Sequence, residues 1–79
     1  MTEYRLDITT EVCPLTFVKT KLLLERMQPG DTAVVRLMRG EPLENVPRSI
    51  AELGHTIVSL DPESAGSDVH VLKLQKAAA

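Results

Sequence analysis

The spacing of apolar residues changes along this chain between the alternation typical of strands and the longer period of helices, and this succession limits the folds that it can adopt. Residues 4–8 alternate apolar and charged side chains, which predicts a strand with one buried face. A helical pattern covers residues 14–28 and stops at Pro29-Gly30, since both residue types end helices. The β-branched residues within 32–38 predict a second strand.

The second half of the chain continues with one helix and two strands. The segment 39–42 contains Gly and Pro and breaks the second strand. Asn45 and Pro47 then open a short helix that runs to Leu53 and is closed by Gly54. The remaining segments are a third strand over residues 55–60, a turn-forming linker over 62–67 and a fourth strand over 69–75.

This order, β-α-β-α-β-β, predicts an α+β fold: a two-layer α/β sandwich with a mixed four-stranded sheet and two helices on one face. The 79 residues allow one domain, ordered over about 4–76 with a short C-terminal tail. The first two strands should be parallel through a right-handed crossover. The loops that leave these two strands should therefore meet at one edge of the sheet.

Cys13, the only cysteine, lies where the first strand gives way to the first helix, directly before Pro14. Because Pro suits the first helical position, Cys13 is predicted as the N-cap and residues 14–16 (Pro14, Leu15 and Thr16) as the first turn. The helix dipole and the unpaired N–H groups of that turn favour the thiolate over the thiol. They raise the thiolate fraction at pH 7 from about 3% to about 10–25%.

Arg39 and Gly40 follow the second strand and should lie near Cys13 at the same sheet edge. They are candidates for stabilising a sulfur anion, and the alternative is that Arg39 is only a solvated loop residue. His55 begins a strand at the opposite edge, and His70 lies within the last strand. Neither histidine is predicted to pair with Cys13.

The first helix carries two apolar stripes, of which a two-layer fold can bury one. The stripe of Phe17, Thr20, Leu23, Leu24 and Met27 has uncharged flanks and is predicted to face the sheet. The other stripe is interleaved with charged residues and should stay exposed beside the cysteine. This exposed stripe predicts a surface that docks a partner protein. The alternative is that these are ordinary surface apolar residues without a shared role. This surface consists of Leu15, Val18, Lys19 and Leu22.

Composition excludes several classes of function. One cysteine allows no intramolecular disulfide, and two histidines form no metal-ligand cluster of recognisable spacing. The sequence has no apolar stretch long enough to predict a membrane span. It also has no signal-like start that would predict secretion. A net charge of −2 with one Tyr and one Phe does not suit direct nucleic-acid binding. We expect a cytoplasmic, monomeric protein without metal or cofactor.

Several short motifs are spread over nearly the whole chain: Leu6-Asp7, Cys13-Pro14, Met27-Gln28-Pro29-Gly30-Asp31-Thr32, Val46-Pro47 and Gly54-His55. Together they resemble the TusA/SirA-like sulfur carriers, in which a Cys-Pro-x-Pro motif opens the first helix of a β-α-β-α-β-β domain. The chain departs from that pattern at Thr16, which replaces the second Pro, and at Met38-Arg39-Gly40, which replaces an acidic loop.

The resemblance implies that Cys13 is the catalytic residue of a persulfide relay. It would accept sulfane sulfur from a donor of the desulfurase or rhodanese type and pass it to an acceptor sulfurtransferase, as in tRNA thiolation, cofactor sulfuration or sulfur oxidation. Such a chain acts as a relay between proteins and not as a free-standing enzyme. The alternative is a non-catalytic interaction or regulatory module that retains the fold and uses the exposed helix and the basic loop for binding.

Overall fold

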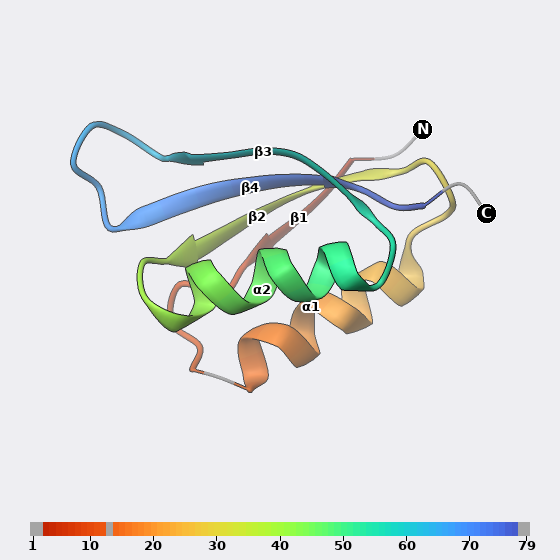
Figure 1. Cartoon of the computed structure of the whole chain (residues 1–79), viewed down its shortest axis with the longest axis horizontal. Helices are drawn as coiled ribbons and strands as arrows, with labels where there is room; N and C mark the ends of the chain where they lie inside the picture. The colour runs from red at the N-terminus through yellow and green to blue at the C-terminus, as the bar shows by residue number, and fades with distance from the viewer. Residues whose placement is uncertain (1–2, 13, 78–79) are drawn as a thin grey trace.

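The computed structural model describes residues 3–12 and 14–77, and its elements follow the predicted order (Figure 1). They are β1 (Glu3–Asp7), α1 (Leu15–Arg26), β2 (Thr32–Met38), α2 (Glu41–Glu52), β3 (Thr56–Pro62) and β4 (Val69–Gln75). The strands form one sheet in the order β1-β2-β4-β3, with β1 parallel to β2 and the other pairs antiparallel. Both helices lie on one face of this sheet (Figure 1). The predicted α+β sandwich is confirmed.

The register of β1 and β2 sets the position of the loops that follow them. Asp7, the last residue of β1, is opposite Arg36, and the next residue, Ile8, donates its N–H to the carbonyl of Arg36 at 2.9 Å. Both strands therefore run to the same edge of the sheet. The loop into α1 and the loop into α2 leave from this edge, as the crossover rule predicts.

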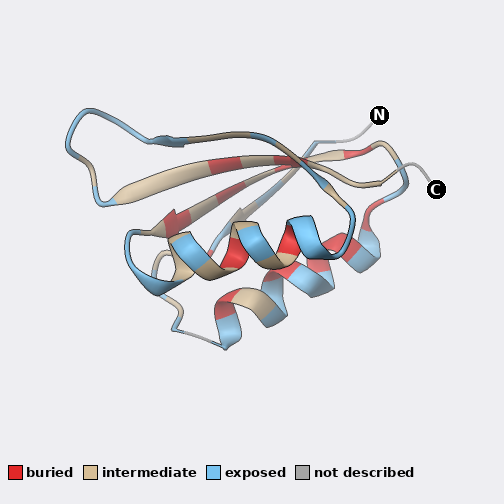
Figure 2. Cartoon of the chain, in the orientation of Figure 1, coloured by how far each residue is buried: buried red, intermediate tan, exposed pale blue. Residues whose placement is uncertain are grey.

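The core lies between the helices and one face of the sheet (Figure 2). On β2, buried residues alternate with half-buried ones, so that one side of the strand faces the helices. Thr16 and Thr20 are also buried, and the Thr20 hydroxyl donates to the Thr16 carbonyl at 2.8 Å, which gives a buried polar group a partner. The buried apolar residues are Ile8, Leu23, Leu24, Met27, Ala33, Val35, Leu37, Val46, Ile50, Leu72 and Leu74.

Helix α1 is shorter than residues 14–28. Its N-cap is Pro14, so the prediction that Cys13 is the N-cap is wrong. The Leu15 N–H donates to the Val12 carbonyl at 2.8 Å, and this turn delays the first helical residue to Leu15. At the other end, Met27 is extended and ends the helix before Gln28.

Helix α2 begins at Glu41, four residues before the predicted start at Asn45. The segment 39–42 ends the second strand as predicted, but Pro42 also lies in the first turn of α2, where a residue needs no intrahelical donor. Pro47 lies inside the helix and removes one backbone donor. Burial of Val46 and Ile50 against the core stabilises the helix despite this loss.

Strand β3 is one edge of the sheet and extends two residues beyond the predicted end, to Pro62 opposite His70. Its register against β4 shifts between Ile57 and Ser59, which is a β-bulge or similar irregularity. A proline is tolerated there because an edge strand has one side without a partner.

Candidate functional site

The candidate site is the loop that joins β1 to α1. Cys13 itself lies outside the described residues, and the site is built from its neighbours 8–12 and 14. The Glu11 N–H donates to the Ile8 carbonyl at 3.2 Å, and the Val18 N–H donates to the Pro14 carbonyl at 3.0 Å. Local turns therefore bring the chain from the edge of the sheet to the start of the helix.

The first turn of α1 combines exposed and buried residues. Pro14 and Leu15 are exposed, whereas Thr16 is fully buried against the core. This turn contains no acidic side chain, so no carboxylate there opposes the positive end of the helix dipole. The helix start thus keeps the electrostatic character that favours an anion.

The outer face of α1 is accessible (Figure 2), and it carries three exposed apolar residues. Leu15, Val18 and Leu22 expose 46%, 42% and 55% of their surface, which confirms that this stripe points away from the sheet. Phe17, expected to face the sheet, is only half-buried. Val12, in the loop, exposes 70% and extends the apolar surface toward the position of Cys13 in the chain. Helical periodicity gave no signal for Val12 because it precedes the helix.

A charged pair borders this apolar stripe. The Lys19 ammonium on α1 contacts the Glu11 carboxylate in the loop. This ion pair connects the loop to the helix and leaves the Lys19 side chain about half exposed. Leu15, Val18, Lys19 and Leu22 therefore share one accessible face, and its use for docking remains a prediction.

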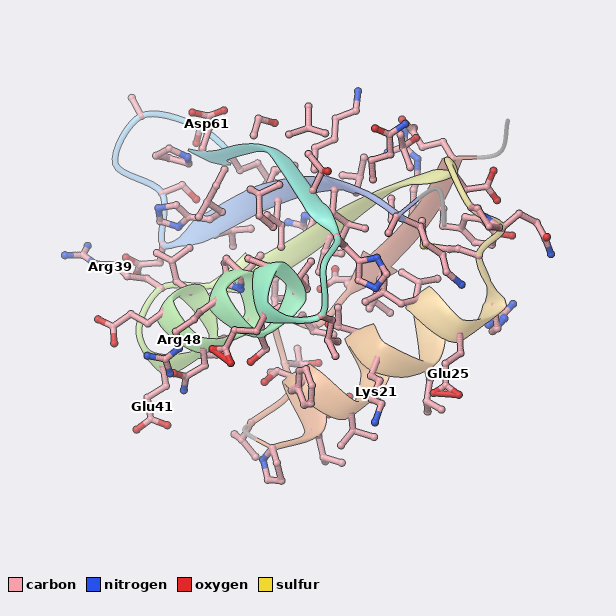
Figure 3. All side chains as sticks on the ribbon, turned by 45° about the vertical axis from the view of Figure 1, so that its right-hand side comes forward. Lys21, Glu25, Arg39, Glu41, Arg48 and Asp61 are labelled. Carbon is pink, nitrogen blue, oxygen red and sulfur yellow. The ribbon has the colours of Figure 1, made fainter. Side chains whose placement is uncertain are left out.

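Arg39 follows β2 and turns toward the β3–β4 connection. Its guanidinium lies 3.5 Å from the Asp68 carboxylate, and its backbone N–H donates to the Asp68 carbonyl at 2.8 Å. In Figure 3 its side chain extends away from both helices. Gly40 is the N-cap of α2 and has a φ of +110°, which glycine adopts readily. A role of Arg39 and Gly40 in stabilising a sulfur anion remains a prediction.

A hydrogen-bonded ionic network at the end of β1 was not predicted from the sequence. One oxygen of Asp7 accepts the N–H and the hydroxyl of Thr9 at 2.9 and 2.6 Å, and the other accepts Nη1 of Arg36 at 2.6 Å. Nε and Nη2 of Arg36 also donate to Glu63 at 2.6 and 3.0 Å. The bonds from Thr9, followed by Arg36, lower the pKa of Asp7. The hydrogen bond from Arg36 likewise lowers the pKa of Glu63.

His55 lies at the end of the sheet where β2 begins, away from the edge at which the loop 8–14 leaves. Its Nδ1 accepts the backbone N–H of Ala77 at 3.0 Å. Burial and the nearby Lys76 cation lower the pKa of His55, which favours the neutral acceptor form. His70 is half-buried in β4.

Among residues 3–12 and 14–77, no group of three or more His, Cys, Asp and Glu side chains is arranged to hold a metal ion. Within the same residues, no helix has the length and apolar character needed to cross a membrane.

Comparison with known proteins connects this architecture to a family. The profile described as sulfurtransferase TusA matches residues 4–76, which include the loop and both helices. This chain belongs to that family. The resemblance inferred from the motifs is thereby confirmed.

Two relatives of the TusA-family chain are described as sulfur carriers. One, from Archaeoglobus fulgidus, is 43% identical over 56 residues, which make up 71% of this chain and 64% of that protein. The chain thus spans slightly less than two thirds of that relative. The other, TsuB of Escherichia coli K12, is 33% identical over 73 residues, covering 92% of this chain and 95% of that protein.

The fold of the TusA-family chain is also found in a crystal structure. A SirA-like protein from Desulfitobacterium hafniense superimposes with a TM-score of 0.79, covering 96% of this chain and 99% of the other, at 14% sequence identity. This match supports the sandwich architecture.

Proposed function

We propose that this chain is a sulfur carrier in which Cys13 holds sulfane sulfur as a persulfide between a donor protein and an acceptor protein. The observation that carries the proposal is the position of Cys13: it is the only cysteine of a TusA-family chain, and it precedes Pro14 in the loop between β1 and α1. The description of the two relatives as sulfur carriers supports the same function.

The proposed transfer is an exchange between sulfur atoms. The Cys13 thiolate attacks the outer sulfur of the donor's persulfide, forming an S–S bond on Cys13 while the S–S bond of the donor breaks. The donor leaves as a thiolate, and Cys13 carries the persulfide. An acceptor thiolate then attacks the outer sulfur and releases the Cys13 thiolate. Each step conserves the number of S–S bonds, so neither needs an external oxidant or reductant.

The start of α1 supports the anionic forms in this proposal. Pro14 is the N-cap and Leu15 and Thr16 begin α1 directly after Cys13 in the sequence, and the first turn contains no acidic residue that would oppose the helix dipole. The loop of Arg39 and Gly40 leaves the same sheet edge and is proposed as a weaker source of positive potential, because Arg39 is already paired with Asp68.

The exposed stripe of α1 is the proposed docking surface. Leu15, Val18 and Leu22 would contact partner proteins, with Lys19 at their border. The proposed partners are a desulfurase or rhodanese-type donor and an acceptor sulfurtransferase. We place the relay in the cytoplasm, where a single thiol stays reduced.

The test of the carrier is intact-mass spectrometry after incubation with a cysteine desulfurase and cysteine, or with thiosulfate and a rhodanese. The expected result is a gain of one sulfur atom that a reductant removes and that Cys13→Ser lacks. Uptake by Cys13→Ser would contradict the mechanism. No uptake together with a thiol that resists alkylation would favour the interaction module instead.

The docking surface is tested separately by comparing Leu22→Gln with Leu53→Gln. Leu53 is a matched control because it exposes 48% of its surface at the end of α2, outside the docking stripe. We expect Leu22→Gln to reduce kcat/KM with a protein donor by about tenfold, since burying one Leu side chain contributes about 1.5–3 kcal/mol. Transfer from glutathione persulfide should be unchanged in both variants. Equal rates for both variants with the protein donor would exclude Leu22 from docking.

A further inference from the structure

The ionic network of Asp7, Arg36 and Glu63 lies on the sheet face opposite the helices, and the proposed sulfur transfer does not explain it. Arg36 stands in the middle of the network. It donates through Nε and Nη2 to both oxygens of Glu63 and through Nη1 to Asp7. This arrangement connects the chain after β3 to the last residue of β1 across the intervening strands.

Arg36 holds the end of β1 in two ways. Its guanidinium binds the Asp7 carboxylate at 2.6 Å, and its backbone carbonyl accepts the Ile8 N–H at 2.9 Å. The other oxygen of Asp7 accepts both the N–H and the hydroxyl of Thr9. An Asp that binds the backbone two residues later forms an Asx-type turn, which fixes the direction of the following chain.

The same loop is attached to α1 at its other end. The Glu11 carboxylate contacts the Lys19 ammonium, and the Val12 carbonyl accepts the Leu15 N–H. The loop that contains Cys13 is therefore anchored to the sheet where it begins and to the helix where it ends. Exposed ion pairs of this kind add little to stability, so removing one should leave the chain folded.

We propose, building on the proposed function of Cys13, that Asp7 and Arg36 are positioning residues for sulfur transfer. They hold the start of the loop 8–14, which carries Cys13 in the sequence, in one geometry relative to the sheet. Thr9 transmits this restraint from the carboxylate to the backbone.

When Asp7 is substituted, the loss of its charge and the loss of the turn that it forms predict opposite changes in the reactivity of Cys13. Removing a negative charge near a thiol, by itself, makes the thiolate easier to form and the thiol more reactive. Losing the turn at Thr9 releases the start of the loop that carries the thiol and makes the thiol less reactive. Asp7→Ala removes the charge, the turn and the Arg36 contact. Asp7→Asn keeps an oxygen that can accept from Thr9, but it removes the charge and also the Arg36 contact, because its amide nitrogen cannot accept a hydrogen bond.

The experiment measures two properties of each variant: the rate of Cys13 alkylation by iodoacetamide as a function of pH, and the rate of sulfur transfer from glutathione persulfide. We expect Asp7→Ala to slow transfer by roughly tenfold and to move the alkylation midpoint to higher pH. Asp7→Asn, which keeps the turn at Thr9 but loses the Arg36 contact, should slow transfer less than Asp7→Ala does, by roughly threefold. Glu3→Gln is the control, since Glu3 lies on the same strand and pairs only with Arg5 among the described ion pairs.

Thr9 provides a second pair of variants that is decisive if Asp7→Ala does not fold. Thr9→Val removes the hydroxyl with little change in shape and should move the midpoint in the same direction as Asp7→Ala. Thr9→Ser keeps the hydroxyl donor and should retain the dependence of the alkylation rate on pH that the unmodified chain shows. Faster alkylation in both Asp7 variants would show an effect of charge and overturn the positioning role.

The unmodified chain separates this inference from the proposed function. Failure of the unmodified Cys13 to take up sulfur would overturn both. Uptake by the unmodified chain with no change in any Asp7 or Thr9 variant would leave the carrier function intact and overturn the positioning role alone.

Discussion

Lys76 joins the C-terminal end of the chain to the end of helix α1, and its substitution gives a quantitative test of the fold. Its ammonium donates to the carbonyls of Leu24 and Met27, each at 2.7 Å. These carbonyls lie at the C-terminal end of the helix, where backbone acceptors lack the usual donor four residues later, and the Leu24 carbonyl also accepts the Met27 N–H at 3.2 Å. Lys76→Met removes both charge-assisted hydrogen bonds and keeps most of the aliphatic side chain.

The expected loss of stability follows from the number and environment of these bonds. A hydrogen bond to a charged group contributes about 1.5–3 kcal/mol when it is well protected from water. Both bonds are only partly buried, so water replaces part of the interaction, and we expect a total loss of about 2 kcal/mol. For a chain of 79 residues, this corresponds to a decrease in Tm of roughly 12 °C.

The assay is urea unfolding at neutral pH together with a thermal scan. Lys73→Met is the matched control, because Lys73 lies in β4 three residues before Lys76 and its side chain has no hydrogen bond or ion pair among those of the described residues. The control should change stability by less than about 0.5 kcal/mol. If Lys76→Met also stays within that range, the two carbonyls are satisfied equally well by water and the reasoning is refuted.

Two further substitutions probe the backbone and the titration of the fold. Gly40→Ala should lower the free energy of unfolding in urea by about 1–3 kcal/mol, because the φ of +110° at Gly40 is strained for Ala. The added Cβ would meet no atom within 4 Å, so the strain comes from the backbone alone. An unchanged unfolding midpoint would contradict this prediction. The lowered pKa of His55 means that its stabilising contribution is complete above the unfolded pKa of about 6.5 and is lost as pH falls through the folded pKa. In His55→Asn the amide oxygen can accept from Ala77 without titrating, so the free energy of unfolding should depend less on pH in this range. An unaltered slope of that free energy against pH would assign the dependence to other groups.

The sequence predicted the succession of elements because each has a clear apolar period. Strands β2 and β4 have the predicted bounds, and the exposed side of α1 follows from the charges beside Leu15, Val18 and Leu22. The start of α2 was missed because Pro42 terminates a strand and also fits the first turn of a helix, and only packing distinguishes the two.

The surroundings of the site were harder to predict than its location. The position of Cys13-Pro14 follows from local order along the chain. The contacts of Arg36 with Asp7 and Glu63 depend on side chains that are 29 and 27 residues apart, and they form only after the strands are paired in register. The one local signal was Asp7 followed two residues later by Thr9, a spacing that is typical of Asx turns.

The irregular edge of the sheet also has a consequence for the behaviour of the protein at high concentration. A long, flat edge strand offers unpaired backbone groups to another chain and promotes aggregation. On β3, the register shift between Ile57 and Ser59 and the terminal Pro62 interrupt such a row of donors and acceptors. On the opposite edge, β1 has only five residues, of which Glu3, Arg5 and Asp7 are charged. Both edges therefore disfavour continuous pairing between sheets of neighbouring molecules, which favours a protein that remains dispersed.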